Sequence, residues 1–195
     1  MRDPIEEILG RDSLLQAEME RSGARFEERK EQVRLAQCIG LALSRRGSVL
    51  AEAGTGTGKT LAYLVPALLS GKRVVVSTAT KTLQDQIFFK DIPLLSRVLG
   101  KPIRASYMKG RANYLCKARY EELSELQGFA SREEMDAFPI VERFIATTGS
   151  GDLSELSLPE GFPLRKKLTS TAETCIGKEC PRHDVCFVTR MRRQA

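Results

Sequence analysis

The segment Ala53-Gly54-Thr55-Gly56-Thr57-Gly58-Lys59-Thr60 decides the fold of this chain. It matches the phosphate-binding P-loop pattern, with Ala53 in place of the first glycine of the stricter form. Glycines allow backbone N–H groups to turn inward around phosphates, where bulkier residues would obstruct them. The helix that follows points the partial positive charge of its N-terminus at the same anions. The segment therefore predicts a nucleotide site, against the alternative of a glycine-rich turn that binds nothing.

The last two residues of the loop carry the expected chemistry. The Lys59 ammonium is predicted to reach the β- and γ-phosphates, and the Thr60 hydroxyl to ligate Mg²⁺, so both are candidate catalytic residues. The residues expected to surround the nucleotide are Ala53, Gly54, Thr55, Gly56, Thr57, Gly58, Lys59 and Thr60.

The surroundings of the loop predict an α/β fold. Residues 48–53 form a short apolar run read as a buried strand, and a helix is expected to begin at Lys59. A second strand is expected at 73–78, followed by a helix near Lys81. Strands that alternate with helices predict a parallel sheet with crossover helices. Pro66 lies inside the first of these helices and predicts a kink there, because proline removes one backbone hydrogen bond.

Apolar positions divide the rest of the chain. Residues 1–25 read as a polar, partly helical lead-in, and a better helical register from Phe26 ends near Gly47. Beyond about residue 108 the pattern changes to weakly amphipathic helices at 118–126 and 132–145, with no further parallel strand. This later part is interpreted as an insertion in the first domain.

Composition fits a globular protein. Hydrophobic residues make up 42% and charged residues 29% of the 195 residues. The longest apolar run, Leu61 to Leu69, is too short to cross a bilayer, and no apolar signal core follows Met1, so a cytoplasmic protein is expected. A formal net charge of +6 fits a polyanionic partner or, equally, a solvated surface of lysines and arginines.

Four of the five cysteines follow the pattern C-x58-C-x4-C-x5-C, from Cys116 through Cys175 and Cys180 to Cys186. In a cytosolic chain, cysteines indicate metal ligands or free thiols more often than disulfides. Four thiolates suit Zn²⁺ or an iron–sulfur cluster, but structural zinc usually takes paired C-x2-4-C knuckles, which are absent here. The spacing favours a cluster, with zinc and unliganded thiols left open.

Two segments around these cysteines resemble the iron–sulfur superfamily 2 DNA helicases of the XPD/DinG type. Residues 107–116 (YMKGRANYLC) are similar to the segment that opens the cluster domain, and residues 180–187 (CPRHDVCF) to its close. The likeness runs from about Ile5 to Arg193 and is nearer to the bacterial DinG-like branch. It implies a RecA-like ATP-binding domain, a 4Fe-4S cluster, single-stranded DNA as track and 5′-to-3′ movement. The implied cluster ligands are Cys116, Cys175, Cys180 and Cys186, which leaves Cys38 as a buried core thiol and His183 as a surface residue.

Two further segments support the resemblance. Residues 26–32 resemble the adenine-reading region of these helicases, which implies that Arg29 and Gln32 bind the base and select ATP. Residues 77–86 resemble the motif that holds a DNA phosphate at a strand end, although capping of a helix by Thr80 or Ser77 explains the same residues.

Basic and aromatic residues beside Cys116 suggest a contact with a nucleic-acid strand. Lys109, Arg111 and Tyr114 combine cations with an aromatic ring, the composition of single-strand binding surfaces. A solvated basic face is the equal alternative for each of them.

The resemblance implies the following domains: a lead-in (1–25), the first part of the RecA-like domain (26–107), the mostly helical cluster insertion (108–190) and a return to the first domain (191–195). No Asp-Glu-x-His segment, which holds Mg²⁺ and positions water in this family, follows Cys186. The chain is therefore expected to be an incomplete, monomeric N-terminal fragment of a helicase without ATPase activity of its own. A non-motor nucleotide- and metal-binding nucleic-acid module is the alternative; a P-loop kinase or a GTPase is the third, the latter disfavoured because an Asn-Lys-x-Asp segment is absent.

Overall fold

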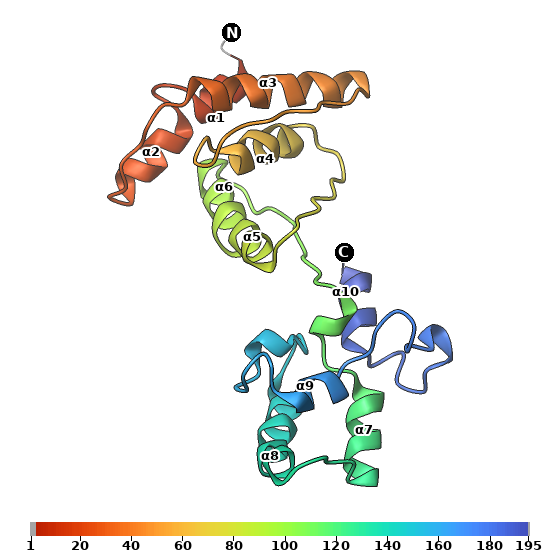
Figure 1. Cartoon of the computed structure of the whole chain (residues 1–195). Helices are drawn as coiled ribbons and strands as arrows, with labels where there is room; N and C mark the ends of the chain where they lie inside the picture. The colour runs from red at the N-terminus through yellow and green to blue at the C-terminus, as the bar shows by residue number, and fades with distance from the viewer. Residues whose placement is uncertain (1–2, 195) are drawn as a thin grey trace. The chain divides into compact units, whose positions relative to one another are not determined.

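The structure, a computed structural model, describes residues 3–194. It divides between Ala105 and Ser106 into two compact units, unit 1 before this point and unit 2 after it (Figure 1). Each unit has a hydrophobic core of its own. The nucleotide-loop residues therefore lie in unit 1, and the four cysteines of the C-x58-C-x4-C-x5-C pattern lie in unit 2.

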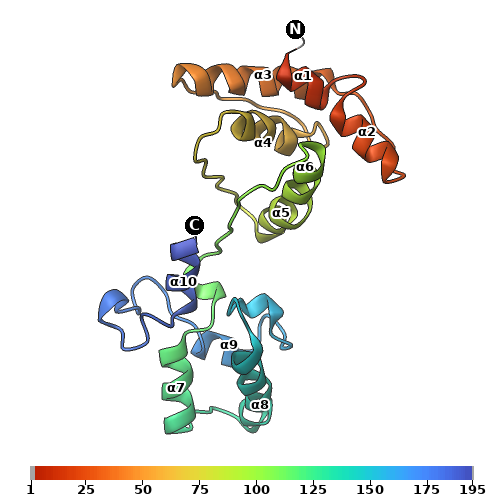
Figure 2. The same ribbon diagram turned by 180° about the vertical axis from the view of Figure 1, so that it is seen from behind.

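Unit 1 is helical in its described residues. Its elements are α1 (Pro4–Leu9), α2 (Leu14–Arg21), α3 (Lys30–Arg45), α4 (Lys59–Leu69), α5 (Lys81–Gln86), the π-helical turn η1 (Ile87–Asp91) and α6 (Ile92–Val98). Helix α3 packs along α4, an arrangement that Figures 1 and 2 show from opposite sides. The predicted helix starts at Lys59 and Lys81 are confirmed, and α4 continues through Pro66 to Leu69.

The lead-in belongs to the core of unit 1. Asp3 caps α1, whose first residue is Pro4, and Ser13 caps α2 by accepting a hydrogen bond from the backbone N–H of Gln16. Leu9 and Leu15 from these two helices are buried in the core. The buried carboxylate of Glu18 in α2 accepts from Arg97 Nε in α6 at 2.7 Å, which joins the lead-in to the end of the unit.

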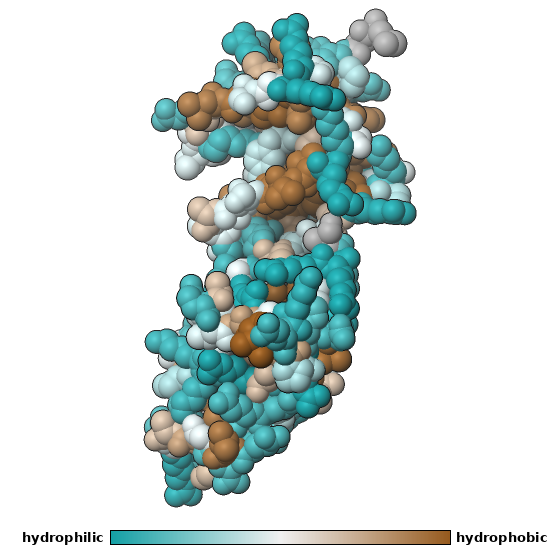
Figure 3. All heavy atoms as spheres, turned by 90° about the vertical axis from the view of Figure 1, so that its right-hand side faces the viewer, coloured by the Kyte–Doolittle hydropathy of each residue, from teal (hydrophilic) through white to brown (hydrophobic). Residues whose placement is uncertain are grey.

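The two predicted strands are not strands in this structure. Residues 48–53 and 73–78 have no regular secondary structure, and within residues 3–194 the one β-bridge joins Tyr114 to Asp152. A strand satisfies its backbone groups by pairing with a neighbour, and none of the described segments lies in that position. The apolar side chains expected in a sheet are therefore exposed, with Leu50 at 103% and Val75 at 89%. Figure 3 shows hydrophobic atoms at the surface of unit 1.

The prediction that Cys38 is a buried core thiol is wrong, because its side chain is exposed. Helix α3 turns Gln32, Val33 and Ala36 inward. Cys38 lies two residues beyond Ala36, about 200° around the helix and therefore on the opposite face. Leu41 on the same helix is also half exposed.

Unit 2 is also built from helices and turns. Its elements are η2 (Arg111–Asn113), α7 (Lys117–Leu126), α8 (Arg132–Thr147), η3 (Leu153–Glu155), α9 (Pro163–Lys167), η4 (Gly177–Glu179) and α10 (Phe187–Gln194). The helices predicted at 118–126 and 132–145 are confirmed as α7 and α8. Ser131 caps α8, whose Val141 and Phe144 enter the core, and Tyr120 from α7 stacks on Phe138.

A buried acid joins α8 to α9. The Glu134 carboxylate accepts from Lys167 Nζ at 2.6 Å and from the backbone N–H of Ala130 at 2.7 Å. The hydrogen bond from Lys167, then that from Ala130, hold the pKa of Glu134 below its usual value. None of the helices in residues 3–194 is long and apolar enough to span a membrane.

Acid is expected to weaken unit 2 through Glu134. A carboxyl whose pKa is lowered by folding stabilises the folded state above its unfolded pKa, about 4.3, and loses that contribution as the pH falls through the lower folded value. Thermal unfolding followed by circular dichroism between pH 7 and pH 3 should show this loss, and Glu134→Gln should flatten the slope. An unchanged slope in the variant would contradict the assignment.

Candidate functional site

The phosphate loop depends on two glycines with left-handed backbone. Gly56 has φ 79° and Gly58 has φ 77°, a region that residues with a Cβ rarely adopt. Gly58 is also the residue before α4, so its conformation sets the direction from which the chain enters the helix. The loop therefore ends at a helix N-terminus with exposed backbone around Gly54, Thr55 and Gly56, the arrangement predicted for binding phosphates.

The Lys59 side chain folds back over the loop. Its ammonium donates to the carbonyl oxygens of Ala53, at 2.8 Å, and Gly54, at 2.5 Å. The Thr57 hydroxyl also donates to the Gly54 carbonyl, at 3.0 Å. The cation thus lies inside the curve of the loop, where an anion would find both a charge and backbone donors.

Gln32 contacts the loop directly. Its side chain is buried, and its Nε2 donates to the Gly58 carbonyl oxygen at 2.8 Å. A Cβ at Gly58 would lie 2.1 Å from that nitrogen, so only glycine fits beside Gln32. Arg29, the second residue predicted to contact adenine, lies before the first turn of α3 and pairs with Glu27 at 2.9 Å.

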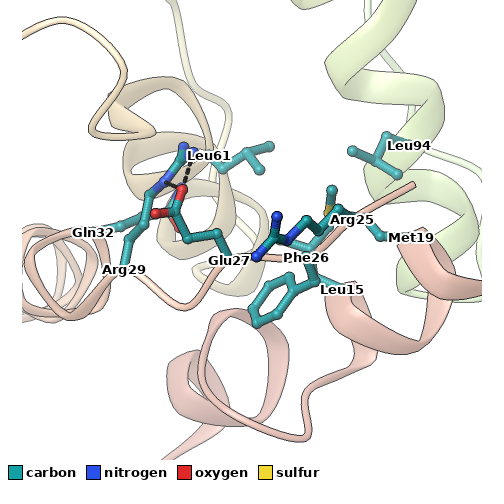
Figure 4. Close-up of a pocket in the computed structure, with 9 residues that line it drawn as sticks. All are labelled: Leu15, Met19, Arg25, Phe26, Glu27, Arg29, Gln32, Leu61 and Leu94. Carbon is teal, nitrogen blue, oxygen red and sulfur yellow. Dashed lines mark hydrogen bonds and ion pairs between the residues drawn. The ribbon is translucent and has the colours of Figure 1, made fainter.

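A pocket of about 510 Å³ opens beside Arg29 and Gln32 (Figure 4). Its other lining residues are Leu15, Met19, Arg25, Phe26, Glu27, Leu61 and Leu94. Figure 4 shows Phe26 and Leu61 from different segments on its sides, with the Arg29–Glu27 ion pair at one end. The pocket combines apolar walls with a few polar groups, as sites for small planar ligands do, and its volume is within their usual range.

Thr60 is the second residue of α4 and is partly buried. Burial raises the pKa of the Tyr63 phenol one turn later, and the neighbouring Thr60 hydroxyl opposes the rise. On the next helix, Thr80 caps α5 by accepting from the backbone N–H of Leu83 at 3.2 Å. The capping explanation of the 77–86 segment is therefore confirmed for Thr80, and a DNA phosphate at this position stays a prediction.

The four predicted metal ligands all lie in unit 2, and none of them forms a disulfide. Cys116, Cys175, Cys180 and Cys186 are free, partly exposed thiols. Cys116 precedes α7 and Cys186 precedes α10, while the other two lie in a turn-rich segment around η4. In residues 3–194, no group of three or more Cys, His, Asp or Glu side chains is close enough together to hold a metal ion. The donor chemistry suits iron or zinc, but in the described residues the four thiols are not gathered into one site.

The structure corrects the surface expected beside Cys116. The Lys109 side chain is buried with that of Asp152, at 2.7 Å, and the Tyr114 hydroxyl accepts from the Lys109 backbone N–H at 3.0 Å. Lys109 and Tyr114 are therefore both buried, with exposures of 5% and 2%. Arg111 is partly exposed, so its contact with a nucleic-acid strand stays a prediction. The same prediction is wrong for Lys109 and Tyr114, because both are buried. His183, predicted on the surface, is also partly exposed and lies 3.6 Å from Asp184.

The DEAD/DEAH box helicase family model matches residues 35–126. The matched segment contains the phosphate loop and the helices that surround it, together with Cys116 and α7. The helicase family is thus found over the part of the chain where the nucleotide site was predicted.

Several curated helicases are similar over a longer stretch. The chain is 38% identical over 182 residues to the ATP-dependent DNA helicase YoaA of Haemophilus influenzae, which covers 93% of the chain and 28% of that protein. It is 36% identical to YoaA of Escherichia coli, over 87% of the chain and 27% of that protein. The chain is 33% identical to the 3′-5′ exonuclease DinG of Bacillus subtilis, and the matched region covers 71% of the chain and 15% of that protein. The chain thus spans less than a third of the length of each of these relatives.

Gly58→Ala is expected to weaken nucleotide binding by at least about tenfold, roughly 1.4 kcal/mol, because alanine is strained at this φ and meets Gln32. Gly71→Ala is the matched control, since Gly71 also has a left-handed backbone, with φ 64°, but lies outside the loop and has no atom within 4 Å of a Cβ built there. Titration with a fluorescent ATP analogue measures both. Equal affinities of the two variants would contradict the role given to Gly58.

Proposed function

We propose that this chain, which belongs to the DinG-like superfamily 2 helicases, supplies the ATP-binding and 4Fe-4S portion of an ATP-dependent 5′-to-3′ DNA helicase. The observation that carries this proposal is the phosphate loop itself. Two left-handed glycines, a helix N-terminus and the Lys59 ammonium converge on one exposed curve of backbone.

The nucleotide would lie along this curve and extend toward the pocket beside α3. Lys59 would exchange its two carbonyl partners for phosphate oxygens, which are stronger acceptors because they are charged. Thr60 would hold Mg²⁺ through its hydroxyl. Arg29 and Gln32 would contact adenine from the wall of the 510 Å³ pocket, with the Gln32 carbonyl oxygen available while Nε2 holds Gly58.

A RecA-like fold would have a parallel sheet beside these helices. We propose residues 48–53 and 73–78 as two of its strands, because each contains an apolar run and leads into a loop before α4 or α5. Val74, Val75 and Val76 are β-branched and exposed, which suits them to a pleated, buried surface once neighbouring strands lie alongside. This assignment completes the proposed domain order, with residues 26–107 in the helicase domain and 108–190 as the insertion.

The four thiols in unit 2 support the cluster proposal. A 4Fe-4S cluster takes four cysteine thiolates and can accept them from separated segments. Cys116, Cys175, Cys180 and Cys186 would hold it and would have to converge from the positions described above. The cluster, when bound, would supply a rigid cross-link among these segments. Single-stranded DNA as partner, a monomeric state and a cytoplasmic location belong to the same proposal and follow from the family resemblance.

Calorimetry with Mg·ATP and Mg·GTP tests the nucleotide proposal on the purified chain. We expect binding of Mg·ATP in preference to Mg·GTP, loss of binding in Lys59→Met, and ATP turnover at background level because the Asp-Glu-x-His segment is absent from these 195 residues. Strong DNA-stimulated turnover, or equal binding by Lys59→Met, would refute it.

Iron and acid-labile sulfide analysis of anaerobically purified protein tests the cluster proposal. We expect about four iron and four sulfide per chain with a broad visible absorption near 400 nm. A colourless protein with one Zn²⁺ would overturn the cluster and favour a zinc site.

A further inference from the structure

An ion pair is completely enclosed in unit 2. The Lys109 ammonium and the Asp152 carboxylate are 2.7 Å apart, and each side chain is only 3% exposed. Burying two charges is costly unless their remaining bonding groups are also satisfied. Here Asp152 accepts in addition from the backbone N–H of Ser154, at 2.9 Å, and from its hydroxyl, at 2.8 Å. Such a pair, formed between segments 43 residues apart, fixes their relative position.

The backbone on both sides of the pair is joined as well. Tyr114 and Asp152 form an isolated antiparallel bridge, and the Leu115 N–H donates to the Gly151 carbonyl at 2.8 Å. The next residue, Cys116, donates its N–H to the Leu168 carbonyl at 2.7 Å. Asp152 of the ion pair is therefore joined by backbone contacts to Tyr114 and, through Gly151, to Leu115, the residue before Cys116.

Gly151 is also in contact with Phe187, the residue that follows Cys186. A Cβ at Gly151 would lie 2.3 Å from the Phe187 ring, so the ring packs directly on the glycine backbone, which has φ 69°. Phe187 is 2% exposed, and the Lys117 ammonium lies 4.8 Å from its ring centre. Gly151 thus contacts the residue before Cys116 and the residue after Cys186.

The other two thiols are held differently. The N–H groups of Cys175 and Cys180 donate to Thr171 and Gly177, within the same turn-rich segment. Cys175 Sγ accepts from the Gly177 N–H at 3.4 Å, also inside that segment.

We propose that the buried Lys109–Asp152 pair is a positioning device that fixes Cys116 and Cys186 on the core of unit 2. This role rests on the proposed function. The ion pair would hold two of the four proposed cluster ligands, Cys116 and Cys186, on the core, and the segment that carries Cys175 and Cys180 would bring the other two. Lys109 and Asp152 act through the backbone of Leu115 and Gly151 and do not themselves touch a metal.

Alkylation of each cysteine by iodoacetamide, followed over time by mass spectrometry on chelator-treated, reduced protein, tests this proposal without any metal. In Asp152→Asn we expect the rates at Cys116 and Cys186 to rise at least about tenfold, the change that a local loss of roughly 1.4 kcal/mol produces, with Cys175 and Cys180 little changed. Glu134→Gln is the matched control, since it also turns a buried, lysine-paired carboxylate of unit 2 into an amide. All four rates should stay near wild type in that control.

Unchanged rates at Cys116 and Cys186 in Asp152→Asn would overturn the proposal, as would an equal rise at all four cysteines in both variants. If circular dichroism shows that Asp152→Asn does not fold, Lys109→Met replaces it and the same outcomes apply. This variant keeps the apolar stem of Lys109 and the two bonds from Ser154 to Asp152, and it removes the ammonium with its bonds to Asp152 and to Ser154 Oγ. Iron and sulfide in the wild type separate the two proposals. If the wild type contains no iron but Asp152→Asn still raises the alkylation rates of Cys116 and Cys186 alone, only the cluster proposal is refuted. If the wild type contains iron but Asp152→Asn does not raise these two rates selectively, only the positioning role is refuted.

Discussion

The hydrogen bond from the Gln32 side-chain amide to the Gly58 carbonyl oxygen is the interaction on which the nucleotide end of unit 1 depends. It joins α3, which carries one wall of the pocket, to the left-handed residue that starts α4. Because Gln32 is buried, water cannot replace this bond without opening the packing between the two helices. The pocket proposed for the base and the loop proposed for the phosphates are consequently joined by this bond, and we expect a ligand that occupies either to act on the other through Gln32.

Unit 2 adds ion pairs to its hydrophobic core. Lys109–Asp152 is enclosed, while in Lys167–Glu134 the carboxylate is buried and the lysine side chain is 32% exposed; both pairs join segments that are distant in sequence. Pairs of this kind are strongly destabilising when one partner is removed, and they define a unique arrangement of the chain more than they add stability. In this unit, the arrangement they define includes the backbone that carries Cys116 and the residue that follows Cys186.

The sequence allowed the helix starts at Lys59 and Lys81 to be predicted, because the glycine-rich loop and the Thr80 cap are local signals. The two predicted strands do not form in this structure, because a strand needs neighbouring strands and the described residues provide none. Cys38 was misplaced because its helix has hydrophobic residues on more than one face, and Lys109 because a basic residue beside an aromatic one reads as a surface. No local signal marks its burial, because its partner Asp152 stands in a polar stretch between Thr147 and Ser157, and only the fold pairs residues so far apart. The contacts of the nucleotide and of the four thiols with their ligands remain predictions.

Calorimetric titration of Gln32→Ala with Mg·ATP and with Mg·tripolyphosphate, which has no base, tests most directly whether Gln32 couples the pocket to the phosphate loop. Gln37→Ala on the same helix is the control, because Gln37 bonds to Asp3 at 2.6 Å, away from the loop. We predict that Gln32→Ala weakens the binding of tripolyphosphate about tenfold and that of ATP by at least the same factor, because ATP also loses a contact with its base, while Gln37→Ala leaves both affinities near wild type. Weaker ATP binding with unchanged tripolyphosphate binding would contradict the account and would leave Gln32 as a contact of the base alone.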